Sequence, residues 1–344
     1  MTMSSSESSR RPPTLEEVAA LAGVGRGTAS RVINGSTQVS EASRKAVLQA
    51  IDDLGYVPNR AARSLVTRLT DVVALVVSES EERFFGEPFF GQIVRGVSGA
   101  LAGTQRQLLL TMAHRARDRG QLDNYLSRQH VDGVLLLSLH GDDPLPAQLA
   151  HRGVPAVLGG RPTEPTSLPF VDVDNAGGAA QAVAHLAGRG RRRIATITGP
   201  QDMSVGLLRL EGYRNALAQA GLPFDPALVA TGDFSEQSGW LATEELLERA
   251  PDLDAVFAAS DQMALGALSA LAARGRRVPQ DVGVIGFDDS PSSRYTTPRL
   301  TTVHQPVEEM GAEMMRLLGE LIADAEGPQE NVLLDTHLVV RESA

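Results

Sequence analysis

The stretch GVGRGTASRVING, residues 23–35, is compatible with two different folds. Three glycines within five residues are typical of a phosphate-binding loop that opens a nucleotide-binding domain. They are also typical of a tight turn that leads into a DNA-reading helix. The residues on either side of the stretch distinguish the two.

A capped helix precedes the glycines. Thr14 followed by Glu17 makes a capping box, which predicts a helix from residue 15. Its apolar stripe is Leu15, Val18, Ala19 and Ala22. A dinucleotide-binding loop needs a β-strand before its glycines and a third glycine three residues after the second, where this chain has Thr28. The nucleotide-binding interpretation therefore fails on context.

Two more short helices are expected after the glycines. The second runs from about Arg26 to Asn34, with Ala29, Val32 and Ile33 facing inward and a polar outer face. Ser40 caps the third, and Gly55 ends it. The apolar stripe of this third helix is Val47, Ala50, Ile51 and Leu54. Three such helices, the first two joined by a glycine turn, indicate a helix-turn-helix unit.

Charge is unevenly distributed along the 344 residues. Residues 1–70 hold nine Lys or Arg and six Asp or Glu, a net charge of +3. The whole chain holds 32 and 42, so the other 274 residues carry a net charge of −13. This asymmetry favours a small DNA-facing head on an acidic body.

From residue 72 onward, short apolar runs alternate with helical patterns. The runs are VVALVVS (72–78), QLLLTMA (107–113), GVLLLS (133–138), PAVLGG (155–160), RRIATITG (192–199), AVFAAS (255–260) and VGVIGFDD (282–289). Runs of this length predict parallel sheets with helices on both faces, arranged as two lobes. Ligands of such sheets bind at the carboxyl ends of the strands, so the expected site is the cleft between the lobes.

The order and spacing of several motifs resemble the LacI/GalR family of bacterial transcription regulators. These motifs are TLEEVAALAGVGRGTASRVING, VSEASRKAVLQAIDDLGYVPNRAARSL, VDGVLLLS, FVDVDNAGG, GRRRIATITGP, AASDQMALGAL, VPQDVGVIGFDDS and LTTVHQPVEEMG. More narrowly, GVGRGT, GEPFF, GGRP and THLVVRES are similar to regulators of cellobiose and cello-oligosaccharide use.

The resemblance implies an all-α helix-turn-helix head with a hinge helix, joined to an α/β body like that of periplasmic binding proteins. The body would consist of two doubly wound parallel-sheet lobes. The implied boundaries are a disordered tail (1–13), the head (14–58), the hinge helix (59–70) and an effector-binding and dimerisation domain (71–344). Within that domain, lobe 1 would take about 71–170 plus 304–325, and lobe 2 about 171–303 plus 326–344.

The resemblance also implies a homodimer that places its two heads in successive major grooves of a palindromic double-stranded DNA operator. Arg26 is the expected partner of a guanine, because an arginine pairs bidentately with guanine O6 and N7. Other expected DNA contacts are Gly27, Thr28, Ser30, Arg31, Asn34, Tyr56 and Asn59, and for Thr28 and Ser30 a solvated helix face is the alternative. At Gly27 the missing side chain would let the backbone approach the DNA. Leu65 matches a leucine that wedges into the minor groove, and Ala62 permits the close approach.

A small sugar effector, cellobiose or a related oligosaccharide, is implied for the cleft. The matching positions are Phe89, Phe90, Arg161, Arg209, Phe234, Ser260, Asp288 and Gln305. A guanidinium and a carboxylate opposite flat aromatic faces suit a neutral polyol, because each hydroxyl needs a partner once water is expelled. Phe89 and Phe90 have an alternative role as core aromatics, and we expect Asp261 to cap the following helix.

Other functional classes fit less well. The seven histidines show no metal-ligand spacing, and the chain has no cysteine, no G-x-S-x-G elbow and no P-loop, so we expect neither catalysis, metal nor cofactor. The polar start MTMSSSESSRRPP and the absence of long apolar runs predict a cytoplasmic protein, unlike the exported sugar-binding proteins. A purine or nucleoside effector, a co-repressor mechanism and an activator remain alternatives. The family's tetramers carry an extra leucine-rich C-terminal helix, whereas this sequence stops at RESA directly after its last expected strand. We therefore expect a dimer and not a tetramer.

Overall fold

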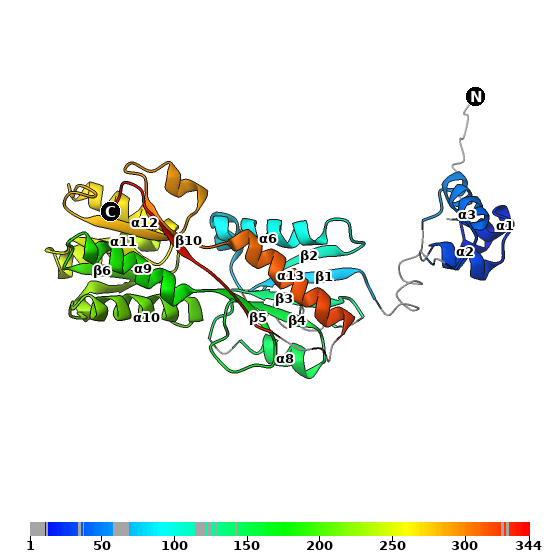
Figure 1. Cartoon of the computed structure of the whole chain (residues 1–344), viewed down its shortest axis with the longest axis horizontal. Coiled ribbons are helices and arrows are strands. Elements are labelled where there is room, and N and C mark those ends of the chain that lie inside the picture. The colour runs from blue at the N-terminus through cyan, green and yellow to red at the C-terminus, as the bar shows by residue number, and fades with distance from the viewer. Residues whose placement is uncertain are drawn as a thin grey trace, which may run out of the picture. The chain divides into compact units, whose positions relative to one another are not determined.

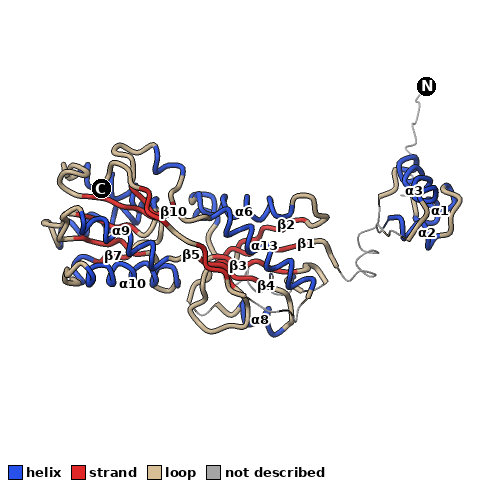
Figure 2. The backbone as a smooth tube through the Cα atoms, in the orientation of Figure 1, coloured by secondary structure: helices blue, strands red, loops and turns tan. Residues whose placement is uncertain are grey.

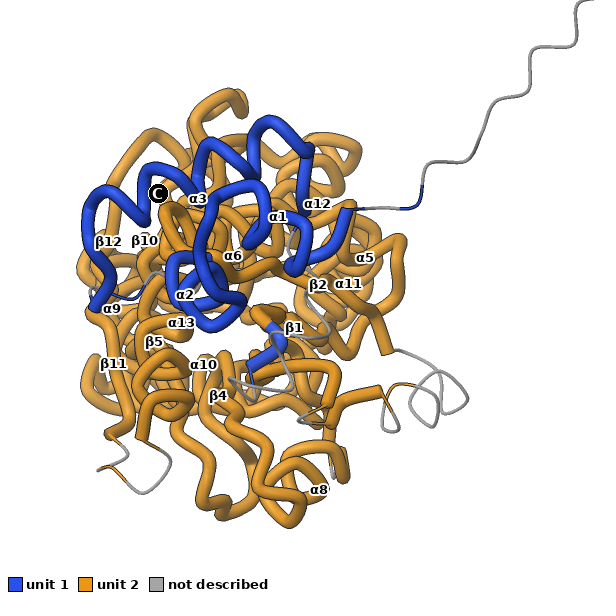
Figure 3. The backbone as a smooth tube through the Cα atoms, turned by 90° about the vertical axis from the view of Figure 1, so that its right-hand side faces the viewer, with its two compact units in different colours: residues 1–70 blue, residues 71–344 orange. Residues whose placement is uncertain are grey.

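The computed structural model describes residues 11, 13–33, 36, 38–57, 69–113, 122, 125–127, 129–141, 143–324, 327 and 330–344. The chain divides into two compact units, residues 1–70 and residues 71–344, coloured separately in Figure 3. The first unit is built from helices and the second from helices and strands.

The first unit contains the three predicted helices. They are α1 (Leu15–Leu21), α2 (Arg26–Ile33) and α3 (Glu41–Leu54). The capping box is present, because Thr14 Oγ1 accepts a hydrogen bond from Glu17 N at 3.3 Å and Glu17 Oε2 accepts one from Thr14 N at 2.7 Å. Ser40 caps α3, and Gly55 follows that helix with a φ of +61°. The local signals in the sequence therefore determine where these helices begin and end.

The helices of the first unit pack around a small apolar core. Val18, Ala29 and Val47, one from each helix, are fully buried. Gly23, with a φ of +64°, makes the turn between α1 and α2. This left-handed conformation favours glycine, because a Cβ is strained there. The apolar stripes meet in this core, which leaves the outer face of α2 toward solvent.

The second unit contains two six-stranded sheets (Figures 1 and 2). The first sheet has the order β11 (Val332–Leu334), β5 (Phe170–Val173), β4 (Ala156–Gly159), β3 (Gly133–Leu137), β1 (Val72–Val77) and β2 (Gln107–Met112). The second has the order β12 (His337–Val339), β10 (Thr301–His304), β9 (Gly283–Asp288), β8 (Ala255–Ala258), β6 (Ile194–Thr198) and β7 (Val229–Thr231). All neighbouring strands are parallel except β10 and β12. The seven predicted strands and the two lobes are confirmed.

Helices cover both faces of each sheet. In the first lobe they are α5 (Glu81–Gly86), α6 (Pro88–Leu101), α8 (Leu145–His151) and α13 (Val307–Ala323). In the second they are α9 (Asn175–Gly188), α10 (Ser204–Gln219), α11 (Glu236–Arg249) and α12 (Asp261–Ala273). Alternate residues of a strand point to opposite faces of the sheet and pack in different apolar cores. Leu135 of β3 packs with α6 and α13, whereas Leu136 packs with α8. Burial on both faces explains the continuous apolar runs in the sequence.

The chain crosses between the lobes later than expected at two places. We expected lobe 2 to begin at about residue 171 and to include residues 326–344, yet β5 and β11 both belong to the first sheet. β5 pairs with β4, and Val332 of β11 pairs with Val171 of β5. β5 and β11 therefore both extend the first sheet before the chain passes to the second lobe. The chain crosses between the lobes after β5, after β10 and between β11 and β12. This edge pairing is a long-range property that the local sequence pattern does not reveal.

Candidate functional site

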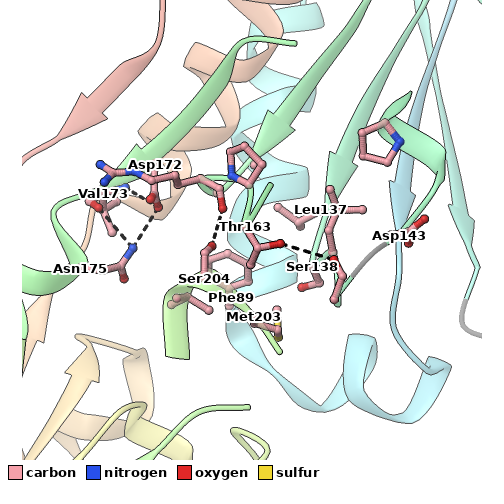
Figure 4. Close-up of a pocket in the computed structure, with 18 of the residues that line it drawn as sticks. Phe89, Leu137, Ser138, Asp143, Thr163, Asp172, Val173, Asn175, Met203 and Ser204 are labelled. Atoms are coloured by element: carbon pink, nitrogen blue, oxygen red, sulfur yellow. Dashed lines mark hydrogen bonds between the residues drawn. The ribbon is translucent and has the colours of Figure 1, made fainter. Parts of the chain in front are cut away.

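A cavity of about 460 Å³ lies at the carboxyl ends of the strands of both sheets. Gly159 of β4 and Asp172 of β5 line it from the first lobe, and Asp288 at the end of β9 lines it from the second. Figure 4 shows part of its wall. All eight residues expected to contact an effector line this cavity: Phe89, Phe90, Arg161, Arg209, Phe234, Ser260, Asp288 and Gln305. The structure therefore brings together side chains that are more than 200 residues apart.

Arg209, on α10, is a rigidly held cation. Its side chain is 4% exposed, and its Nε donates to Asn175 Oδ1 at 2.9 Å. Its guanidinium lies 3.6 Å from the centroid of the Phe287 ring, and its Nη1 lies 3.6 Å from Asp288 Oδ1. Burial lowers the pKa of Arg209, and the nearby carboxylates, Asp288 first, raise it. Stacking on Phe287 and hydrogen bonding to Asn175 fix the orientation of this guanidinium group.

Asp288 is the acceptor that faces Arg209. Its backbone φ is +115°, an unusual value for a residue with a side chain, and it stands at the end of β9. Gln305 Nε2 donates to Asp288 Oδ1 at 2.6 Å. Burial raises the pKa of Asp288, while the charge of Arg209 acts in the opposite direction. Strained backbone at a strand end thus aims a carboxylate into the cavity.

The three predicted phenylalanines differ in position. Phe90 is 1% exposed and belongs to the apolar core of the first lobe. It is therefore a core aromatic that also contributes to the cavity wall. Phe89 is partly buried, with its ring edge-to-face to that of Phe90 at 5.4 Å. Phe234 enters from the second lobe with a φ of +72°. A Cβ added at Gly199 would lie 2.1 Å from the Phe234 ring, so this glycine makes room for the ring.

The prediction that Asp261 caps α12 was wrong, because the residue before it is the cap. Ser260 is the N-cap of α12 and accepts a hydrogen bond from Met263 N at 3.2 Å. Asp261 is fully buried, and it accepts from Ser290 N at 2.7 Å and from Thr302 Oγ1 at 2.5 Å. Burial raises the pKa of Asp261. Asp261 therefore ties α12 to the loop after β9 and to strand β10, while Ser260 both caps the helix and lines the cavity.

Arg161 stands at the mouth of the cavity. Its side chain is exposed, and its guanidinium lies 5.8 Å from the Phe170 ring. Its backbone carbonyl accepts a hydrogen bond from the Ser204 hydroxyl, which belongs to α10 of the second lobe (Figure 4). The loop that carries Arg161 thus contacts both lobes.

Sequence reasoning missed Asp172 as a site residue. Asp172 is 4% exposed and lines the cavity, and its Oδ1 accepts from Val173 N at 2.9 Å and from Asn175 Nδ2 at 3.0 Å (Figure 4). Its Oδ2 is buried with no hydrogen-bond partner among the described residues. Burial raises the pKa of Asp172. The signal was an acid near the end of a strand in FVDVDN, and the free oxygen is an acceptor that a ligand hydroxyl can satisfy.

Arg83 and Glu87 were also missed. Both line the cavity, and Arg83 Nε donates to Glu87 Oε1 at 2.6 Å. The Arg83 guanidinium lies 5.2 Å from the Phe234 ring, across the cleft. Burial raises the pKa of Glu87 to about 7, although Arg83 acts against it. An acid and a base four residues apart resemble an ordinary surface helix pair, so their sequence gave no sign of a cavity wall.

In the first unit, the outer face of α2 presents several of the residues expected to bind DNA. Arg26 is 72% exposed and pairs with Glu16 at 3.0 Å. Gly27 and Arg31 are exposed, and Thr28, Ser30 and Tyr56 are partly exposed. A Cβ added at Gly27 would meet no atom within 4 Å, so packing does not require this glycine. Asn34, Asn59, Ala62 and Leu65, with most of the expected hinge helix, lie outside the described residues.

Two features of the described residues bear on other classes of protein. No helix in that part of the chain is long and apolar enough to cross a membrane. Nor does that part contain a group of three His, Asp or Glu residues that could hold a metal ion. Neither result conflicts with the arrangement of the cavity and the helical unit.

Comparisons with known proteins agree with both units. Residues 14–59 match the model of the bacterial regulatory proteins of the lacI family, and residues 183–344 match a periplasmic binding protein-like domain. The HTH-type transcriptional regulator CelR of Thermobifida fusca is 57% identical over 336 residues, which cover 97% of this chain and 99% of CelR.

Solved structures give the same result. The structure titled "transcriptional regulator CelR-cellobiose complex" is 55% identical, with a TM-score of 0.78 over 96% of this chain and 100% of that one. The lac repressor dimer bound to operator and the anti-inducer ONPF is 29% identical, with a TM-score of 0.85 over 97% of this chain and 99% of that one. The chain therefore belongs to the lacI family of bacterial regulatory proteins and is a DNA-binding transcriptional regulator.

Proposed function

We propose that this regulator represses genes of sugar use and is released from its operator by cellobiose or a related oligosaccharide. The observation that carries the proposal is the cavity wall, where Arg209, Asp172 and Asp288 stand fixed beside phenylalanine rings. A relative that is 55% identical was solved as a complex with cellobiose. The cavity volume, about 460 Å³, lies within the range of roughly 300–1,000 Å³ common for small-molecule sites.

The charges of the wall favour a neutral ligand. Arg209 faces Asp288, and Arg83 is held by Glu87 and Glu79. Each of these cations already has a carboxylate partner, so an anionic ligand would have to displace one and leave it buried without a counter-charge, which is costly. Sugar hydroxyls can donate to these carboxylates and accept from the guanidinium groups without displacing either. The proposed role of the cavity is binding, with no catalytic step.

The proposed DNA-binding parts are a helix-turn-helix head at 14–58 and a hinge helix at 59–70, with residues 71–344 binding effector and forming a homodimer. Two heads on a dimer fit a palindromic operator, since half-sites repeat with the symmetry of the protein. Arg26 would read a guanine, and Arg31 would contact a base or a phosphate. Leu65 would wedge into a minor-groove step, so Leu65→Ala should keep effector binding and lose operator bending in a gel-shift phasing assay. Because the target is DNA, we propose that the protein acts in the cytoplasm.

Control of DNA binding requires that the ligand bind two lobe arrangements unequally. A sugar that contacts Arg209 of one lobe and Asp172 of the other stabilises one arrangement over the rest. A changed angle between the lobes would move the paired hinges apart and lower the affinity of the dimer for its operator. We therefore propose induction, in which sugar lowers operator affinity.

The test is isothermal titration calorimetry of the full-length protein with cellobiose, with glucose 6-phosphate and adenosine as comparison ligands. The proposal expects cellobiose to bind and the sugar phosphate to be rejected. Saturable binding of adenosine without binding of cellobiose would overturn the sugar assignment in favour of a nucleoside effector.

A further inference from the structure

His140 joins the two lobes at one side of the cavity. It lies in the loop after β3 of the first lobe, and its Nδ1 is 2.9 Å from Asp202 Oδ2, in the loop between β6 and α10 of the second lobe. Its Nε2 is 3.0 Å from Glu79 Oε1, just after β1. One imidazole ring thus contacts a carboxylate of each lobe.

The contact continues into the cavity wall. Glu79 is 3% exposed, and its Oε1 also accepts a hydrogen bond from Arg83 Nη1. Arg83 in turn donates to Glu87, and both residues line the cavity. A single network therefore runs from Asp202 through His140, Glu79 and Arg83 to Glu87. A change in the contact between the lobes would alter the support of two residues in the cavity wall.

The surroundings of His140 favour the protonated ring. Only an imidazolium can donate from both nitrogens, and both face carboxylates. The hydrogen bond to Glu79, and then that to Asp202, raise the pKa of His140 above its ordinary value, while burial opposes them. Asp143, in the same loop, pairs with the Ser78 hydroxyl at 3.3 Å. The nearest described cation in the network, Arg83, lies beyond Glu79 and is held by that residue and by Glu87.

We propose that His140 is a proton-dependent latch between the lobes, a positioning residue whose pairing with Asp202 holds the cavity closed around its ligand. This inference rests on the proposed sugar-binding function of the cavity. The Gly141 N–H donates to the Asp202 carbonyl oxygen at 2.8 Å, so the backbone defines where the lobes meet and the side chains supply the proton dependence.

The sign of the pH effect follows from the pairing. Closing the lobes brings Asp202 to His140 and raises the pKa of His140, so closure takes up protons. Ligand binding should therefore be tighter at low pH and weaken as the pH rises through the raised pKa of His140. Glu87 and Asp288 line the same cavity, and burial raises the pKa of each, so they contribute their own pH dependence. The histidine contribution must be isolated with a variant.

The first test is calorimetry with cellobiose on the full-length protein at about pH 6 and about pH 8.5, either side of the ordinary histidine value of about 6.5. Buffers of different ionisation enthalpy report the protons taken up. We compare wild type, His140→Gln and Asp202→Asn, with His151→Gln as a control, because His151 is exposed at the end of α8.

The latch predicts that His140→Gln binds cellobiose about three- to tenfold more weakly at the lower pH and shows less proton uptake and a flatter pH dependence. Asp202→Asn should have a similar effect, and the double variant should lose little more than either single variant. His151→Gln should match wild type. Equal affinity and proton uptake in wild type and His140→Gln would overturn the latch.

A second test needs no ligand. The latch requires that the free protein also samples closed arrangements in which His140 meets Asp202, and that the ligand increases their population. Histidine NMR of the free protein, with the His140 signal assigned from the His140→Gln spectrum, should therefore give a pKa above about 6.5 that falls in Asp202→Asn. A His140 titration that Asp202→Asn leaves unchanged would overturn the latch whatever the cavity binds. Absence of cellobiose binding together with a titration that shifts would instead refute the sugar assignment and keep the contact between the lobes.

Discussion

Two arginines illustrate how differently the two units of this regulator are prepared for their ligands. Arg209 in the effector cavity is 4% exposed and already bonded, stacked and paired. Arg26 on α2 is 72% exposed and pairs, among the contacts described for it, only with Glu16, which is itself 59% exposed. Contacts within the protein hold Arg209 in place, whereas Arg26 is held only by an ion pair on the solvent-exposed face of α2.

This difference has an energetic reason. A buried cation must be compensated in the folded protein, because an unpaired buried charge is costly. An exposed cation is solvated by water and needs no partner until it meets a base or phosphate. We therefore expect changes to the buried charges of the cavity to affect binding and stability together, and changes to the exposed charges of α2 to affect DNA binding alone.

Arg209→Met should have the largest effect. Removing the guanidinium leaves Asp288 and Asp172 without the cation that faces them and removes the bond to Asn175. Removing one partner of a buried ion pair costs roughly 3–5 kcal/mol of folding stability. Cellobiose also loses a hydrogen bond from a charged donor, worth roughly 1.5–3 kcal/mol, so its affinity should fall by about 10- to 100-fold. Calorimetry gives the affinity and thermal unfolding the stability, with Arg316→Met, an exposed arginine of α13, as control. Affinity within threefold of wild type would refute the preorganised cavity.

Arg26→Lys should have the next largest effect, on DNA alone. The lysine keeps the charge and loses the planar pair of N–H donors that matches guanine O6 and N7. The preference for operator over random duplex should therefore fall by roughly 1–3 kcal/mol. Cellobiose binding should stay unchanged. Fluorescence anisotropy at fixed salt measures the DNA affinity. Equal loss on operator and random duplex would identify Arg26 as a phosphate contact and contradict base reading.

Glu87→Gln should alter the pH dependence of stability. The pKa of Glu87 is about 7 in the folded protein against an ordinary value of 4.5, so its favourable contribution is present at low pH and is lost between 4.5 and about 7. Wild type should therefore lose about 2–4 °C of Tm over this range that the variant does not lose. Glu308→Gln, which is exposed, is the control. Parallel profiles of Tm against pH for wild type and Glu87→Gln would contradict the raised pKa of Glu87.

Gly27→Ala should have the smallest effect and would sharpen the account of α2. A Cβ at Gly27 meets no atom of the chain, so the change should raise the stability of the helix by up to about 1 kcal/mol. Operator affinity should fall if the helix backbone approaches the DNA at this point. Unchanged or tighter operator binding would show that the glycine has no part in the contact.

The sequence predicted the local elements well. The three short helices follow from caps such as Thr14 and Ser40, and the buried strands follow from their apolar runs. The membership of β5 and β11 was missed, because strand pairing depends on contacts far apart in the chain. The eight cavity residues came from the family resemblance. Asp172, Arg83 and Glu87 were missed because their burial, which gives them their chemistry, is a property of the assembled lobes.

The most direct test of the account is an anisotropy titration of the full-length protein on a palindromic duplex, selected by the protein from random palindromes at physiological salt, with and without saturating cellobiose. The account predicts selective binding of that duplex over random DNA and a lower affinity once cellobiose is present. Unchanged or tighter operator binding in the presence of cellobiose would contradict it.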